Sequence, residues 1–148
     1  MAATAGQIAE AGRVPNERIA TTVATSDSST FTGTEVELMS VTAALVSGRT
    51  YRLTFDGQFG SDTSGDNVAA RLRRDDPSTG ATLRRTNNEI HIVSALGVPL
   101  VMSAEYTATS TGDVDFYLTG NRTGGTGNCR LEAAADNSSY LYVDYIRG

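Results

Sequence analysis

Apolar and polar residues alternate in short runs along most of this chain. The clearest run is Tyr51–Phe59, in which Tyr51, Leu53 and Phe55 alternate with polar residues and Phe59 falls in the same phase. A repeat of two residues is typical of a β-strand that buries one face and exposes the other. The pattern therefore predicts a sheet protein in which one face of each strand lines a core.

Turn-forming residues separate the predicted strands at intervals of about 8–12 residues. Pro77 and Gly80 mark one turn, because proline fixes φ and glycine permits a positive φ, and a Gly-rich stretch at residues 123–128 marks another. Further alternating runs lie at residues 36–41, 68–73, 81–86, 90–92, 100–106, 114–118, 129–133 and 140–147. About eight to ten short strands without intervening helical segments indicate an all-β fold, an antiparallel two-sheet β-sandwich of the jelly-roll or immunoglobulin-like kind.

The first 18 residues differ from the rest because they are mostly small and polar, with apolar side chains too far apart to build a core. We therefore predict an extended N-terminal arm at residues 1–18, for anchoring or for contact between subunits, and a β-sandwich domain at residues 19–148. A length of 148 residues fits a single domain of this kind. The arm residues expected to make contacts are Gln7, Ile8, Arg13, Val14 and Pro15.

The last predicted strand, residues 140–147, carries apolar or aromatic side chains on both faces. This is typical of a central strand, or of one that a neighbouring chain covers. Its tyrosines, Tyr140, Tyr142 and Tyr145, fit two roles: aromatic contacts in a core or subunit interface, or a stacking platform for a glycan. The apolar residues on both faces favour the interface.

The net charge is −5, and all 12 basic residues are arginine. The chain thus lacks the basic footprint of a non-specific nucleic-acid binder. Its one local basic cluster, which we expect on the solvated face of a hairpin, comprises Arg71, Arg73, Arg74, Arg84 and Arg85. No apolar run approaches ~18 residues and no apolar signal core follows the amino terminus, so we expect neither a membrane span nor a secretory signal.

Nucleophilic chemistry has few candidates, because the chain has one histidine and one cysteine. Cys129 is in phase with Leu131, which predicts a small buried side chain, and a lone cysteine allows neither an intrachain disulfide nor a Cys-based zinc site. His91 lies between Ile90 and Ile92 and is expected on the opposite, exposed face. A Cys–His nucleophile pair stays as a minor alternative.

Carboxylates offer two further alternatives. Paired acids could hydrolyse glycosides, although the chain has no Trp for a sugar platform; the candidates are Asp56, Glu89, Glu105, Asp113 and Asp115. Asp62, Asp66 and Asn67 could hold a loop Ca²⁺, but their spacing matches no calcium motif and a polar turn is favoured. The glycines of residues 124–127 lack the Gly-Lys-Ser/Thr of a phosphate loop. We therefore predict no enzyme, no metal site and no cofactor.

Four stretches resemble short virion proteins from phages of actinobacteria, a family of hypothetical, minor tail and decoration proteins. They are Ala3–Ile8, Val46–Arg52, Glu105–Asp113 and Ser139–Gly148. The all-arginine composition agrees with such high-GC genomes. The wider pattern also resembles trimeric jelly rolls, in the manner of complement-type and tumour-necrosis-factor-like heads, which is an analogy of fold and does not fix function.

The resemblance implies a virion structural protein, a capsid decoration or head-fibre subunit on the virion surface, assembled in the host cytoplasm. Its expected partners are further copies of itself, as a homotrimer, and the major capsid or tail proteins. The alternative is a minor tail or fibre-tip module that binds host-surface glycan through the 62–67 and 124–128 loops with Tyr140 and Tyr142. A small hydrolase is a third, weaker hypothesis.

Overall fold

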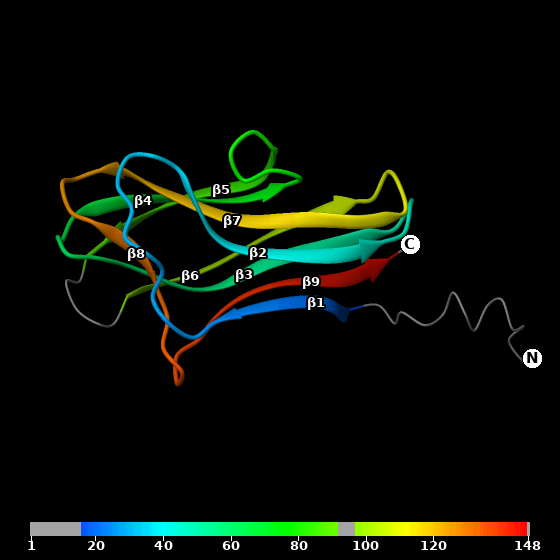
Figure 1. The fold of residues 1–148 in the computed structure, drawn as a ribbon, viewed down its shortest axis with the longest axis horizontal. Helices are drawn as coiled ribbons and strands as arrows, with labels where there is room; N and C mark the ends of the chain where they lie inside the picture. The colour runs from blue at the N-terminus through cyan, green and yellow to red at the C-terminus, as the bar shows by residue number, and fades with distance from the viewer. Residues whose placement is uncertain (1–15, 92–96, 148) are drawn as a thin grey trace, which may run out of the picture.

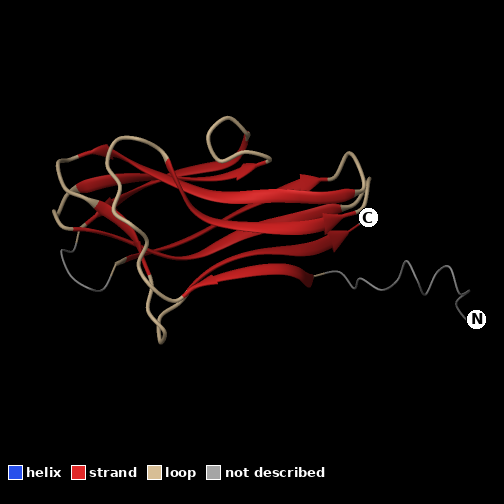
Figure 2. Ribbon diagram, in the orientation of Figure 1, coloured by secondary structure: helices blue, strands red, loops and turns tan. Residues whose placement is uncertain are grey.

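The computed structural model describes residues 16–91 and 97–147, and this part of the chain is built from strands, turns and loops (Figures 1 and 2). The strands are β1 (Glu17–Ala24), β2 (Val36–Leu45), β3 (Thr50–Ser61), β4 (Asp66–Arg74), β5 (Ala81–Ile90), β6 (Val98–Thr107), β7 (Gly112–Gly124), β8 (Cys129–Glu132) and β9 (Ser139–Arg147). No helix long and apolar enough to span a membrane occurs among these residues.

The strands form two antiparallel sheets that pack face to face. The first sheet has the order β1-β9-β3-β6, with β8 pairing the far part of β3, and the second has the order β2-β7-β4-β5. These two interleaved orders are the topology of a jelly roll. The structure thus confirms the predicted all-β, antiparallel two-sheet sandwich.

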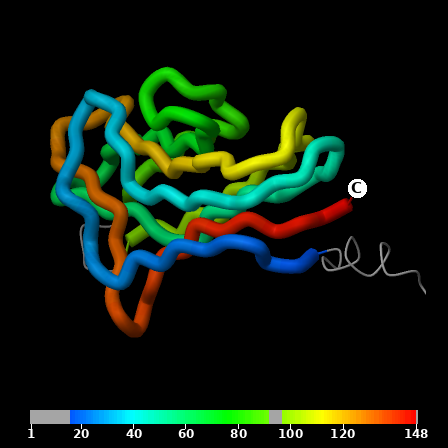
Figure 3. Tube along the Cα trace, turned by 45° about the vertical axis from the view of Figure 1, so that its right-hand side comes forward, coloured from blue at the N-terminus to red at the C-terminus, as the bar shows by residue number. Residues whose placement is uncertain are grey.

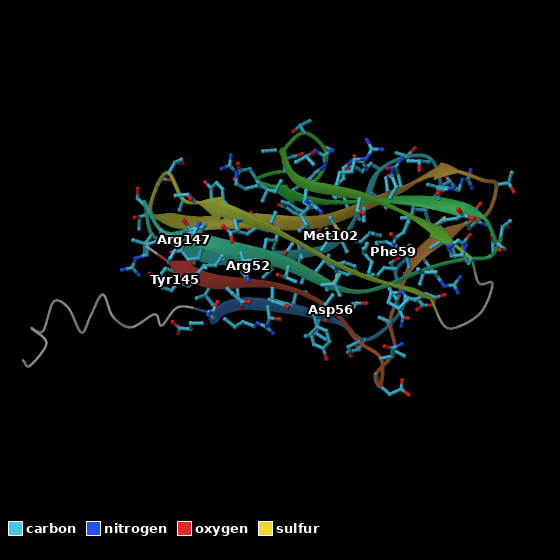
Figure 4. The ribbon with its side chains drawn as sticks, turned by 180° about the vertical axis from the view of Figure 1, so that it is seen from behind. Arg52, Asp56, Phe59, Met102, Tyr145 and Arg147 are labelled. Atoms are coloured by element: carbon cyan, nitrogen blue, oxygen red, sulfur yellow. The ribbon has the colours of Figure 1, made fainter. Side chains whose placement is uncertain are left out.

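The alternation in the sequence decides which side chains enter the core. Tyr51, Leu53, Phe55 and Phe59 on β3 are all buried between the sheets, as their shared phase predicts. Figure 4 shows Phe59 and Met102 between the two layers. Each strand therefore has an inner face that fills the core and an outer face that is available to solvent or partners.

The terminal strand β9 is central, because it lies between β1 and β3 in the first sheet. Leu141, Val143 and Tyr145 point inward, and Tyr140 and Tyr142 lie on the outer face. The strand is therefore central, one of the two positions expected from the sequence, while its inner face alone is buried.

Both ends of the described chain lie at the same end of the sandwich (Figures 1 and 3). The backbone N–H of Asn16 donates to the carbonyl oxygen of Tyr145 at 2.5 Å, and Arg147 pairs with Thr50 at the start of β3. Strand β1 begins at Glu17, so the sandwich starts slightly before the expected boundary at residue 19. The arm residues Gln7, Ile8, Arg13, Val14 and Pro15 lie outside the described residues.

Candidate functional site

Three exposed apolar side chains form a line across the outer face of the first sheet. Val23 on β1 pairs with Tyr140 on β9, Tyr140 pairs with Asp56 on β3, and Asp56 pairs with Val101 on β6. The exposed fractions are 45% for Val23, 40% for Tyr140 and 65% for Val101. We call Val23, Tyr140 and Val101 the apolar row, which Asp56 interrupts between Tyr140 and Val101; Figure 4 labels Asp56 on the outer side of the first sheet. Contiguous exposed apolar surface marks binding sites, and Val23 and Tyr140 are direct cross-strand neighbours in this row.

A second line of outward-facing side chains lies nearer the chain ends. Its charged groups form ion pairs within the protein. Arg18 pairs with Asp144 at 3.2 Å, and Arg52 pairs with Glu105 at 3.2 Å. The guanidinium of Arg18 also lies 3.5 Å from the ring centroid of Tyr142, which covers that ring. These charges already have partners, so this part of the face offers fewer free groups.

The three tyrosines expected to act together are therefore separated by the fold. Tyr145 is only 8% exposed and packs in the core against Tyr51, with ring centroids 5.8 Å apart. Tyr142 shares the outer face with Tyr140 but lies beneath Arg18. Tyr140 alone of the three offers a large exposed ring on the outer face.

An open pocket of about 640 Å³ lies on the same face, beyond the apolar row. Gln58, two residues after Asp56 on β3, contributes to its wall from the sheet. The remaining walls come from the segment that leaves β1, from β8 and from the turn between β8 and β9. The complete lining is Thr25, Ser26, Asp27, Gln58, Arg130, Glu132, Ala133, Ala134, Ala135 and Asn137. Amide, hydroxyl, carboxylate and guanidinium groups thus surround one recess.

The hairpin between β8 and β9 projects from the first sheet and forms one side of the pocket (the orange turn in Figure 1). Backbone hydrogen bonds between Ala134 and Asn137 close its tip, and the Ser139 hydroxyl donates to the Glu132 carbonyl at 3.1 Å at its base. Gly57 on β3 permits the close approach of Ser139, because a Cβ at this position would overlap that side chain. On the opposite side, the backbone N–H of Ala133 donates to Asp27 at 2.9 Å.

The floor of the pocket holds a buried charge pair. Glu132 is 3% exposed, and its Oε1 lies 2.5 Å from Nη2 of Arg130, whose Nε lies 3.2 Å from Asp27. Gly60 and Gly97 leave the space for the Glu132 carboxylate, since a Cβ on either glycine would overlap it. Among the described residues Oε2 of Glu132 has no hydrogen-bond partner, and this atom is enclosed on the side of Gly97.

The acidic side chains of the 62–67 loop, which was expected to be a polar turn or a calcium site, accept hydrogen bonds from other groups of the protein. Asp66 is fully buried and accepts hydrogen bonds from the backbone N–H groups of Thr126 and Gly127, at 2.9 and 3.2 Å, and from the Ser61 hydroxyl. Burial alone would raise the pKa of Asp66, but these hydrogen bonds and the charge of Arg122 outweigh it, so the pKa lies below its usual value. The Gly-rich loop therefore binds a carboxylate of its own chain.

A second carboxylate, that of Asp62, links the same two loops, 62–67 and 124–128. Asp62 accepts hydrogen bonds from the backbone and side-chain amides of Asn128, both at 2.8 Å, and these bonds lower its pKa. Within residues 16–91 and 97–147, no group of three or more metal-ligating side chains is found. The loops at 62–67 and 124–128 are thus joined to each other, and neither contributes to the pocket on the outer face.

On the second sheet, part of the arginine cluster surrounds one acid. Glu35 accepts two hydrogen bonds from Arg73, at 2.7 and 2.9 Å, and lies 3.6 Å from Arg71. Burial would raise the pKa of Glu35, but the bonds from Arg73 and Thr119 and the charges of both arginines bring it below its usual value. Arg74 instead lies over the ring of Tyr106, at 4.6 Å from the centroid. The cluster is therefore partly neutralised inside the protein, rather than a fully solvated hairpin face.

The candidate catalytic groups are dispersed. Cys129 is fully buried, and burial raises the pKa of its thiol, whereas His91 is exposed beside Glu89. Of the candidate carboxylates, Asp56 and Glu105 lie on the outer face of the first sheet, but Asp113 and Asp115 lie on β7 of the second sheet. The residues that sequence reasoning missed are Gln58, Arg130, Glu132 and Asn137.

Comparison with known proteins gives likeness of fold. No protein-family model matches the sequence, and none of the curated proteins matches it. The structure is similar to that of the infectious bursal disease virus Gx strain, with a TM-score of 0.50 and 14% identity over 90% of this chain and 34% of that chain. It is also similar to Eiger TNF from S. frugiperda, with a TM-score of 0.45 and 13% identity over 87% of this chain and 92% of that chain.

A carbohydrate-binding module, CBM4, is similar with a TM-score of 0.37 and 11% identity, over 72% of this chain and 60% of that chain. The chain spans only about a third of the length of the infectious bursal disease virus chains that it matches, between 34% and 38%. At 14% identity, the likeness to the infectious bursal disease virus structure concerns the fold and not the activity of this chain.

Proposed function

We propose that this chain is a structural protein of a phage virion, exposed on the particle surface as a capsid decoration or head-fibre subunit. The resemblance of four sequence stretches to small virion proteins supports this role. The jelly-roll fold is compatible with it, because the structure of infectious bursal disease virus contains the same fold. Self-association as a homotrimer is part of the proposal and rests on the same resemblance.

The observation that carries the proposal is the shared position of the two chain ends. Asn16 and Tyr145 are hydrogen-bonded at one end of the sandwich, so residues 1–15 are joined to the domain at that end. The loops at residues 25–35, 62–65 and 125–128 lie at the opposite end (Figure 1). An arm that docks on a particle would thus leave the far loops and the outer sheet faces directed away from its attachment point.

Deletion of residues 2–15 is expected to abolish particle binding while leaving the sandwich folded, because β1 begins at Glu17. The measurement is co-sedimentation with particles that lack the protein, with circular dichroism and thermal unfolding as the test of folding. Full-length Ile8→Asp with Val14→Asp is the matched variant, since it changes the arm chemistry at constant length. Undiminished co-sedimentation of the folded deletion variant would show that the arm is not the anchor.

A glycan-binding module is the second candidate function, favoured by one observation on the outer face of the first sheet. The pocket lined by Gln58, Arg130 and Glu132 lies next to the exposed ring of Tyr140. Planar polar side chains beside an exposed aromatic ring are suited to hydroxyl-rich ligands. In a virion protein, such a site would serve attachment to the host surface.

A further inference from the structure

We propose that the pocket at the β8–β9 hairpin binds a neutral saccharide ring, and that Tyr140 stacks against the next ring of the same glycan. This assignment rests on the glycan-binding candidate function and names its site and its ligand class. It places binding away from the 62–67 and 124–128 loops, which hold each other through Asp62 and Asp66.

The hydrogen-bonding groups of the pocket complement sugar hydroxyls. Asp27 presents a half-exposed carboxylate, and no side-chain hydrogen bond joins Gln58 or Asn137 to the described part of the chain. A hydroxyl both donates and accepts, so one sugar ring can donate to Asp27 and exchange hydrogen bonds with both amides.

The local charge selects neutral glycans over acidic ones. Two carboxylates, Asp27 and Glu132, flank one guanidinium, that of Arg130, which lies within 3.2 Å of both. The site therefore carries one net negative charge, and a uronic or sialic acid would meet repulsion from the two acids. A metal cation is opposed by Arg130, which already occupies the position between them.

The strand register sets the distance between the pocket and the aromatic ring. Tyr140 pairs with Asp56, and Glu132 pairs with Gln58, two residues further along β3 on the same face. Two residues of a strand span about 7 Å, so the pocket wall at Gln58 and the ring of Tyr140 lie close together on one face. A glycan of two or three units would therefore reach from Gln58 to Tyr140. Tyr142 is excluded from this role because Arg18 covers its ring.

The test is binding of the full chain to a printed glycan array that holds neutral and acidic oligosaccharides, followed by calorimetric titration of the strongest neutral hit. We expect neutral glycans to bind and acidic glycans to give no signal. Gln58→Ala, Asp27→Asn and Tyr140→Ala should each weaken the affinity by about tenfold or more, as for loss of one or two hydrogen bonds or a stacking contact. Tyr142→Ala is the matched control, on the same strand and face, and should change the affinity less than threefold.

Asp27 also pairs with Arg130 and accepts from the Ala133 amide, so Gln58→Ala carries the decision: the half-buried Gln58 side chain makes no hydrogen bond or ion pair with the described residues. Absence of binding to every glycan on the array would overturn both the glycan-binding function and this site. Glycan binding that Gln58→Ala and Tyr140→Ala leave unchanged would overturn the site alone. Preference for acidic glycans would overturn the assigned ligand class. If the wild-type chain binds no glycan on the array and Gln58→Ala loses co-sedimentation with particles, the pocket is a protein contact instead.

Discussion

Replacing Phe59 with alanine is expected to lower the free energy of unfolding by about 3–5 kcal/mol, the usual cost of removing a fully buried ring. Phe59 is 0% exposed and contacts Phe31 and Phe55, with ring centroids 6.4 and 5.8 Å away. It also lies where β3 pairs with both Val98 of β6 and Leu131 of β8. The cavity would therefore open at the junction that supports the pocket.

Chemical denaturation at pH 7, followed by circular dichroism, measures this loss. Val101→Ala on the neighbouring strand is the control, because Val101 is 65% exposed and its truncation should change stability by about 0.5 kcal/mol or less. Phe59→Leu retains most of the apolar volume and should fall between the two, which keeps the comparison available if the alanine variant cannot be purified. A loss below about 1 kcal/mol for Phe59→Ala would contradict the packing described for this ring.

Replacing Asp66 with alanine is expected to cost about 3 kcal/mol, because hydrogen bonds to a buried charged group contribute about 1.5–3 kcal/mol and the donors left behind lose their partner. The variant would leave the N–H groups of Thr126 and Gly127 and the Ser61 hydroxyl without their shared acceptor. The β3–β4 and β7–β8 loops would then lose one of their main connections. Hydrogen exchange of the Thr126 and Gly127 amides should accelerate along with the fall in stability.

The contribution of Asp66 also has a defined pH dependence. Its pKa is lower in the folded protein than the value of about 3.9 for an unfolded chain. Its stabilisation is therefore fully present above pH ~4 and is lost as the pH falls through the folded-state pKa. Unfolding of wild type and Asp66→Asn, compared at pH 7 and at successively lower pH, should show a gap that narrows in acid. The exposed Asp113→Asn is the control, and an equal narrowing in that variant would refute the assignment to Asp66.

The strands could be predicted from the sequence because the signal for them is local. The alternation of Tyr51, Leu53 and Phe55 depends only on the repeat of two residues in β3, and the structure buries all three. The same rule could have divided the tyrosines: Tyr140 and Tyr142 are separated by an even number of positions and share a face, whereas Tyr145 is out of phase with them. The alternation of side chains along a strand is therefore sufficient to separate Tyr145 from the other two tyrosines.

The pocket could not be predicted in the same way, because its residues come from distant parts of the chain. Gln58 and Glu132 meet only through the pairing of β3 with β8, which alternation alone does not specify. One signal was present: Gly57 and Gly60 interrupt an otherwise strong strand pattern. An isolated glycine in a strand indicates a close approach by another group, and here the groups are Ser139 and Glu132.

The adjacency of Asn16 and Tyr145 makes the sandwich a natural subject for circular permutation and for genetic display. A short linker from Arg147 back to Asn16 would close the chain without crossing the sandwich, and new ends could be opened in the 75–80 loop between β4 and β5. A peptide fused after Arg147 would emerge beside the proposed anchor, pressed toward the particle. One inserted at the tip of the β8–β9 hairpin, between Ala135 and Asp136, would be presented to the surrounding medium. For a nanoparticle scaffold, the hairpin and not the carboxyl terminus is thus the position at which to place an epitope.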